Sequence, residues 1–108
     1  MGAAGLAPPL AHLGGARPPA PEWFEQALAH APERTRHEVR GAQIEALAWG
    51  EIGRPGLLLL HGNGAHADWY GFIGPLLADT HRVVALSWSG MGGSDWRASY
   101  SLDLYVAE

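Results

Sequence analysis

The chain has 108 residues and a mass of 11.5 kDa, which is enough for one domain and too little for two. Its net charge of -4 arises from 11 acidic residues and 7 arginines spread along the chain, so it lacks the clustered positive charge of a nucleic-acid-binding surface. It has no cysteine, which excludes disulfides, a thiol nucleophile and cysteine-ligated metal sites. No apolar run, Leu57 to Leu60 included, is long enough to cross a bilayer. We therefore expect a cytoplasmic protein with no cofactor and no membrane or nucleic-acid partner.

The first third of the chain divides into an arm and a short helix. Five of the eight prolines fall within residues 1–21, among alanines and glycines, and this composition predicts a disordered arm. In the next segment, residues 22–33, a helix is predicted from Glu22 to His30, between Pro21 and Pro32. One side of this helix is apolar, and it is formed by Trp23, Phe24, Ala27 and Leu28. We expect it to pack as a flap on the edge of the following domain.

The remaining segment, residues 34–108, begins with two strand patterns. Residues 35–39 and 43–49 flank Arg40-Gly41-Ala42 and predict an antiparallel β-hairpin. After a turn-rich connection, Leu57 to Leu60 forms a continuous apolar run bounded by glycines. Such a run predicts a strand buried on both faces of a parallel sheet.

A β-α-β unit is then predicted. Apolar residues at spacings of three and four indicate a helix from Ala67 or Asp68 to Leu77, although its glycines and proline weaken the pattern. Arg82 to Leu86 is the next strand, parallel to the one before the helix. A glycine-rich loop, residues 87–99, precedes a last helix from Ser101 to Glu108. The fold class is therefore α/β.

The loops after the two parallel strands are the expected ligand site, since α/β sheets bind ligands at the carboxyl ends of their strands. Glycines in His61-Gly62-Asn63-Gly64 allow backbone N–H groups to turn toward an anion or an oxyanion. Residues 62–67 also satisfy the loose G-x-G-x-x-[GA] pattern of a nucleotide-binding unit. The following strand, however, ends in Leu86-Ser87-Trp88, without the acid that would hold a ribose, so this alternative is disfavoured.

The hairpin, the L-L-L-L-H-G sequence of residues 57–62 and the R-V-V-A-L-S-W-S-G-M-G-G-S-D sequence of residues 82–95 together resemble the N-terminal part of the α/β-hydrolase superfamily. The resemblance implies a hairpin followed by a β-α-β crossover of a mostly parallel sheet that is incomplete here. It assigns the backbone N–H of Asn63, with Gly64 as the neighbouring candidate, to an oxyanion hole. It implies loop-shaping roles for His61, Gly62, Gly90, Gly92 and Ser94. The implied ligand is a small-molecule substrate.

Two departures from the family pattern lie in the second loop. Ser87 stands where the family usually has Asp, and Ser89 where it often has Arg, so the ion pair within this loop is missing. We expect hydroxyl hydrogen bonds to replace it. The nucleophile is missing too, because the 108 residues contain no G-x-S-x-G motif.

Two hypotheses follow for the function. In the first, the chain is part of a hydrolase that cleaves an ester or related bond through a covalent intermediate, and it is inactive alone. The chain stops within a helical pattern, which favours truncation. In the second, the chain is a non-catalytic binding or interaction module that acts through an apolar sheet edge.

Other side chains receive structural interpretations. His61 is expected to shape its loop and not to act as a base, and His66 and Asp68 lack the spacing of a metal site. Trp88 is the favoured substrate-contacting tryptophan, ahead of Trp69 and Trp96. The arginines at 82 and 97 are expected to be solvated or to tie loops.

Overall fold

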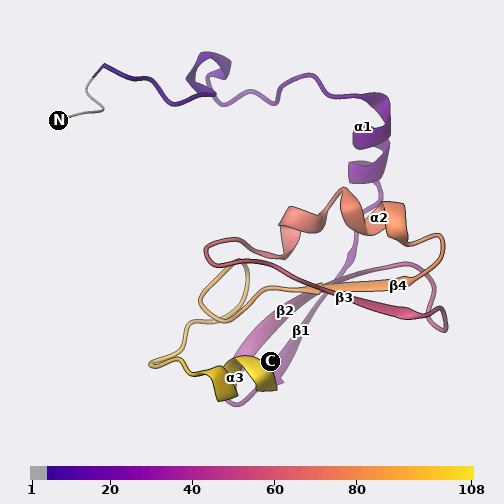
Figure 1. Cartoon of the computed structure of the whole chain (residues 1–108), viewed down its shortest axis with the longest axis vertical. Helices are drawn as coiled ribbons and strands as arrows, with labels where there is room; N and C mark the ends of the chain where they lie inside the picture. Colours follow the sequence, from indigo (N-terminus) through magenta and orange to yellow (C-terminus); the bar gives the residue numbers. More distant parts are fainter. Residues whose placement is uncertain (1–4) are drawn as a thin grey trace.

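The computed structural model describes residues 5–108, and residues 1–4, the start of the predicted arm, lie outside the described residues. The rest of the arm extends away from the sheet and contains one short 3-10 helix, η1 (Ala11–Leu13) (Figure 1). A hydrogen-bonded ion pair of 2.8 Å between Arg17 and Glu25 joins the arm to the following helix. The disorder of this arm stays a prediction.

The predicted short helix is present as α1 (Glu22–Ala29). It lies against the helix between the parallel strands, where the rings of Phe24 and Phe72 have centroids 5.2 Å apart. Ala27 is buried, whereas Trp23 is half exposed. Only part of the predicted apolar side of α1 packs against the domain, because Phe24 and Ala27 do so while Trp23 stays half exposed.

Within residues 5–108, four strands form one mixed sheet in the order β1-β2-β4-β3. The hairpin is confirmed: β1 (Glu33–Val39) and β2 (Ala42–Trp49) are antiparallel. Arg40 and Gly41 join them with φ values of 45° and 86°, the left-handed pair that a two-residue hairpin turn needs. β4 (Arg82–Leu86) pairs with β2 antiparallel and with β3 (Gly56–Leu60) parallel, so the parallel pairing of the β-α-β unit is confirmed as well.

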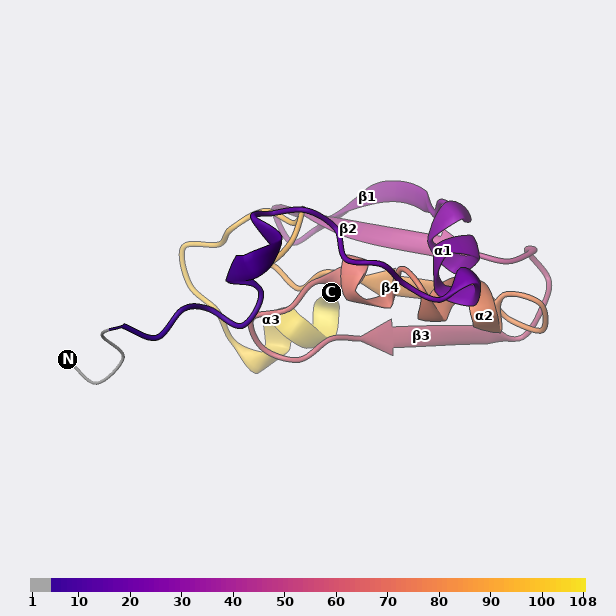
Figure 2. The ribbon, with the colours of Figure 1, turned by 90° about the horizontal axis from the view of Figure 1, so that it is seen from above.

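The single helix predicted between these strands is divided in two. A 3-10 helix, η2 (Ala67–Tyr70), is followed by a short α-helix, α2 (Ile73–Leu77). Gly71 lies at the break, and Pro75 has no N–H to donate to a preceding turn, so one continuous helix does not form. The two pieces and α1 lie on the same side of the sheet (Figure 2).

The core lies between these helices and the sheet. Buried side chains from β2, β4 and η2 form it, namely Leu47, Trp49, Val83, Ala85 and Ala67. A smaller cluster of Ala42, Ile44 and Leu86 packs with Trp88 on the opposite face. The last helix, α3 (Leu102–Ala107), lies near the end of the sheet where the loops after β3 and β4 begin (Figure 1). The side chain of its N-cap residue, Ser101, accepts a hydrogen bond from Leu104 N–H.

The expectation that the run 57–60 is buried on both faces is wrong. Leu57 and Leu59 are partly buried, but Leu58 and Leu60 are 55% and 48% exposed. The reason is that β3 is an edge strand of the sheet, and within residues 5–108 no helix lies against β3 on the side that faces away from α1 and α2 (Figure 1). No helix in the same range is long and apolar enough to span a bilayer.

The tight contact between α2 and the sheet yields a stability prediction. A Cβ atom at Gly74 would overlap the ring of Trp49, whereas one at Gly56 would meet nothing within 4 Å. Helix propensity favours alanine over glycine by about 1 kcal/mol, but overpacking in a core costs about 1–3 kcal/mol. Gly74→Ala is therefore expected to lower the free energy of unfolding in a urea titration. Gly56→Ala is the matched control, and a Gly74→Ala protein as stable as this control would contradict the packing argument.

Candidate functional site

The loop after β3 carries the predicted oxyanion donors. The N–H of Ala65 donates to the carbonyl of Gly62 at 3.2 Å, and Gly64 has a φ of 79°, so residues 62–65 form a tight turn. Within the described residues, neither Asn63 N–H nor Gly64 N–H donates to a protein acceptor. Both residues are exposed. The turn therefore presents two unused backbone donors at its tip.

His61 connects this loop to the loop after β4. Its side chain is buried, Nδ1 lies 2.7 Å from the carbonyl of Gly62, and Nε2 lies 3.1 Å from the backbone nitrogen of Trp88. Because a backbone N–H is the donor, Nε2 accepts and Nδ1 carries the proton, which is one neutral tautomer. The indole N–H of Trp88 in turn donates to the carbonyl of His61. Both ring nitrogens are engaged, so neither is free to take a proton from a substrate.

Residues from both loops line one pocket. Its volume is about 290 Å³, and its walls are Asn63, Trp88, Met91 and Tyr105. Trp88 and Tyr105 meet edge to face with ring centroids 5.4 Å apart. Asn63 and Trp88 were predicted from the sequence, and Met91 and Tyr105 were not. Met91 lies between two glycines of the loop, and this position was a usable signal for a pocket residue. Tyr105 gave no such signal, because the eight-residue helical pattern does not indicate which side of α3 faces the loop.

The second loop is held by glycines and hydroxyls. Gly90 and Gly92 both have positive φ, and a Cβ at Gly92 would lie 2.6 Å from Ser87 Oγ. Ser94 is buried; its Oγ donates to the carbonyl of Ser87 at 2.6 Å and accepts from the N–H of Glu45 at 2.8 Å. The single hydroxyl proton of Ser94 is therefore used within the loop.

Glu45 is a further residue of the site that the sequence patterns do not identify. Its side chain is 12% exposed, and its Oε2 accepts from Ser87 Oγ and from Gly93 N–H, each at 3.0 Å. Ser87 Oγ also accepts from the N–H of Ala67 at 2.9 Å. The alternation along β2, which places Glu45 on the same side as Leu47, was the available signal. The expected hydroxyl hydrogen bonds of the loop are present, but a carboxylate from the neighbouring strand completes them.

Arg34 supplies the positive charge beside this carboxylate. Its guanidinium donates to Glu45 Oε1 at 3.0 Å and forms an ion pair with Asp68 at the start of η2. The hydrogen bond to Asp68, followed by the charges of Asp68 and Glu45, raises the pKa of Arg34 above its usual value. The arrangement joins β1, β2 and η2 at the end of the sheet where the loops emerge.

A buried ion pair fixes the other side of the loop. Arg97 and Glu108 lie 3.3 Å apart with side chains 7% and 0% exposed, and the guanidinium also donates to the carbonyls of Val39 and Arg40. Glu108 accepts from the N–H of Ser89 at 3.2 Å. Arg97 was expected either to be solvated or to tie loops. It ties the loop to the hairpin turn, and its side chain is buried. Ser89 Oγ is buried without a partner among the described residues.

The remaining candidates lie apart from the pocket. Trp69 and Trp96 are exposed and do not line it. His66 Nδ1 lies 3.7 Å from Asp68 Oδ2, and in the described part of the chain no three potential ligand side chains gather into a metal site.

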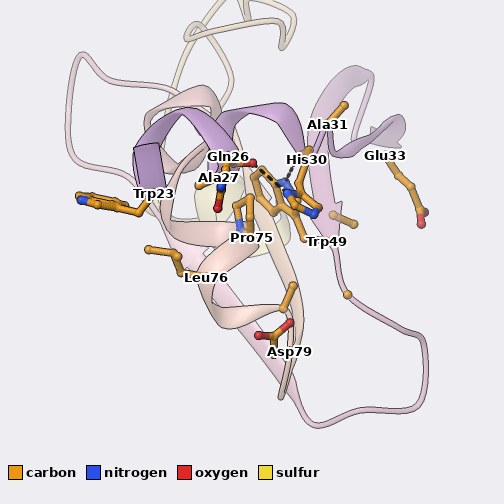
Figure 3. A pocket seen from close by; sticks show the side chains of 13 residues that line it. Trp23, Gln26, Ala27, His30, Ala31, Glu33, Trp49, Pro75, Leu76 and Asp79 are labelled. Atoms are coloured by element: carbon orange, nitrogen blue, oxygen red, sulfur yellow. Dashed lines mark hydrogen bonds between the residues drawn. The ribbon is translucent and has the colours of Figure 1, made fainter. Parts of the chain in front are cut away.

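A larger hollow of about 650 Å³ lies between α1 and α2, with Trp23, Trp49 and Asp79 among its lining residues (Figure 3). Trp49 pairs with Val83 near the start of β4, so this hollow is at the opposite end of the sheet from the two loops. Because ligands of α/β sheets bind at the carboxyl ends of the strands, we assign the candidate site to the smaller pocket.

Comparison with known proteins places this geometry in a family. The chain matches no protein-family model and no curated protein. Among solved structures it is similar to a membrane phospholipase A described as a bacterial virulence factor, with 33% identity and a TM-score of 0.64 over 73% of this chain and 26% of that chain. A thioesterase domain from the curacin biosynthetic pathway is 31% identical, with a TM-score of 0.67 over 71% of this chain and 29% of that domain.

Epoxide hydrolase A from Mycobacterium thermoresistibile is 28% identical, with a TM-score of 0.65 over 70% of this chain and 25% of that enzyme. The chain thus spans between a quarter and a third of the length of these structures. All three share one α/β fold, which the sheet and loops described above match. The chain belongs to the α/β-hydrolase superfamily and contains part of its fold.

Proposed function

We propose that this chain is the part of a hydrolase that supplies the oxyanion-hole loop and one wall of the substrate pocket. The complete protein hydrolyses an ester or a related bond through a covalent intermediate, with its nucleophile, acid and histidine outside these 108 residues. The chain alone is then inactive. The observation that carries this proposal is the pair of backbone donors at Asn63 and Gly64, which have no acceptor among residues 5–108, together with the position of Asn63 in the lining of the Trp88 pocket.

The chemistry follows from where these donors lie. When a nucleophile attacks an ester carbonyl, the carbonyl oxygen gains negative charge, and a backbone N–H already oriented toward it stabilises the transition state. One such donor contributes about 3–4 kcal/mol. A tight glycine turn is suited to this role because the hydrogen bond from Ala65 N–H closes it and leaves the N–H groups of Asn63 and Gly64 without an acceptor among the described residues. The apolar walls of Trp88 and Met91 would accept the hydrocarbon part of the substrate.

The nucleotide-binding alternative lacks a comparable support. A dinucleotide site places its pyrophosphate at the N-terminus of a helix. The loop at residues 62–66 leads instead into η2, which is a 3-10 helix of four residues.

The proposal is tested by comparing this chain with the native gene product. We expect the coding sequence to continue past Glu108 into a G-x-S-x-G or G-x-D motif and the native product to be correspondingly heavier by intact mass. The native product should turn over p-nitrophenyl butyrate, or an epoxide or haloalkane if its nucleophile is Asp, and the 108-residue chain should not. A native product with the mass of this chain and no turnover would exclude catalysis and favour the interaction-module hypothesis.

The backbone donor at position 63 is expected to respond to proline and not to alanine. Asn63→Pro removes the N–H, whereas Asn63→Ala keeps it. In the native hydrolase, Asn63→Pro should lower kcat by about 10²–10³-fold, as the loss of one oxyanion donor does elsewhere. Asn63→Ala should lower it far less. Equal losses in the two variants would show that the side chain, and not the backbone N–H, is used.

The pocket is expected to set the accepted chain length. Met91 lines it, so Met91→Trp would reduce its volume. For p-nitrophenyl esters of increasing acyl length, we expect KM to rise for the long esters while the acetate ester is little affected. Met91→Leu, which conserves volume, is the matched control. A uniform change across all esters would place the acyl chain elsewhere.

A further inference from the structure

Ser87 departs from the family pattern, in which an aspartate usually follows this strand. We infer that Glu45 on the neighbouring strand β2 replaces that missing carboxylate and acts as the positioning residue of the oxyanion-hole loop. The inference rests on the proposed role of that loop, but its main test does not depend on catalysis.

The hydrogen bonds of Ser87 have a fixed direction. Its Oγ accepts from the N–H of Ala67 at 2.9 Å and lies 3.0 Å from Glu45 Oε2. A carboxylate has no proton to give, so the hydroxyl proton of Ser87 goes to Glu45. The serine hydroxyl therefore links the carboxylate of Glu45 to the N–H of Ala67 at the start of η2. An aspartate at position 87 would accept the hydrogen bond from this N–H directly.

The space around the carboxylate fits this exchange. Ser87 is fully buried and short, and the Glu45 carboxylate, whose side chain is 12% exposed, lies 3.0 Å from its hydroxyl. Glu45 Oε2 also accepts from the N–H of Gly93, and a Cβ at Gly93 would lie 2.7 Å from Glu45 Oε1. Gly93 is thus required by the approach of Glu45, because any side chain there would displace the carboxylate.

One carboxylate consequently holds both loops of the site. Through Ser87 it reaches the N–H of Ala67, four residues after Asn63, and through Gly93 it reaches the glycine loop that carries Met91. Arg34 balances its charge at 3.0 Å. Loss of Glu45 would leave Gly93 N–H and the Ser87 hydroxyl without their acceptor, so both loops would loosen together.

The test is a charge exchange between the two positions. Ser87→Asp alone places a second carboxylate beside Glu45, with Arg34 as their shared counter-charge, and should destabilise the protein strongly. Glu45→Gln alone weakens the loop contacts. In the double variant, the new amide at position 45 can donate to the new carboxylate at position 87, which in turn accepts from Ala67 N–H. We therefore expect the double variant to be more stable than Ser87→Asp, with a coupling of about tenfold or more in the unfolding equilibrium constant from a double-mutant cycle.

Two controls distinguish the local charge at position 87 from other effects. One tests the size of the new side chain, and the other tests the net charge of the protein. Ser87→Asn has nearly the shape of Ser87→Asp without its charge, so it should not gain from Glu45→Gln. Glu51→Gln removes a charge from a side chain that is 79% exposed, and it should not rescue Ser87→Asp. If Ser87→Asp does not fold, recovery of a cooperative transition in the double variant supports the inference. Additive losses, or rescue by Glu51→Gln, would overturn it.

A positioning role also predicts a kinetic signature in the native hydrolase. Glu45→Gln should lower kcat for the acetate ester, the substrate that depends least on the Met91 wall, because the variant moves the oxyanion donor. The double variant should recover this kcat. Absence of hydrolysis in the wild type would refute the proposed function while leaving the stability cycle intact. Rescue of stability without rescue of kcat would restrict Glu45 to a structural role and overturn its positioning role.

Discussion

The carboxylate of Glu45, whose side chain is 12% exposed, is the contact on which the loop end of the sheet depends. It accepts hydrogen bonds from Ser87 Oγ and Gly93 N–H, and through Ser87 it is linked to the N–H of Ala67. Ser87 and Ala67 are both buried. A buried polar group without a partner costs about 1–3 kcal/mol, so the carboxylate offsets this cost for the hydroxyl of Ser87. Arg34 makes this arrangement electrostatically favourable, because an unpaired buried carboxylate would itself be strongly destabilising.

A second constraint comes from the uneven cover of the sheet. Helices α1, η2 and α2 lie on one face, while the half of the other face that carries Leu58 and Leu60 has no helix over it within the described residues. Transfer of apolar surface from water contributes about 25 cal/mol per Å², so those leucines add little to the stability of the sheet as it stands. The loop contacts are correspondingly important, since they connect β1, β2, β4 and η2 by hydrogen bonds that do not depend on that face.

The sequence was informative where one short-range pattern decides the structure. Alternation in residues 43–49 and the Arg40-Gly41 turn specified the hairpin, and the β-branched run at 82–86 specified β4. Four leucines did not reveal that β3 has an exposed face, because burial depends on which elements cover a strand and not on its own residues. The helix prediction failed at Gly71 and Pro75, where backbone chemistry outweighed apolar spacing.

For the site, sequence patterns identified the loops but not their supports. His61, Asn63 and Trp88 belong to a recognisable loop pattern, whereas Glu45 reaches that loop only because Ala46 pairs with Leu86 across the sheet. That register is a long-range property. Tyr105 was missed for the same reason, since the side of α3 that meets Trp88 is set by tertiary contacts.

The Arg97–Glu108 pair shows how such long-range contacts give the pocket and the hairpin one support. Glu108 accepts from Ser89 N–H, next to Trp88, while Arg97 holds the carbonyls of the hairpin turn. A buried pair contributes little net stability over an apolar substitute, but removal of one partner costs about 3–5 kcal/mol because the other charge stays buried. The value of the pair is therefore in geometry: it fixes α3, and with it the Tyr105 wall of the pocket, relative to β1 and β2. Glu45 supports the loop after β3 from the other side of the same sheet end. Under the proposed function, the two carboxylates together position the backbone N–H of Asn63 at the pocket.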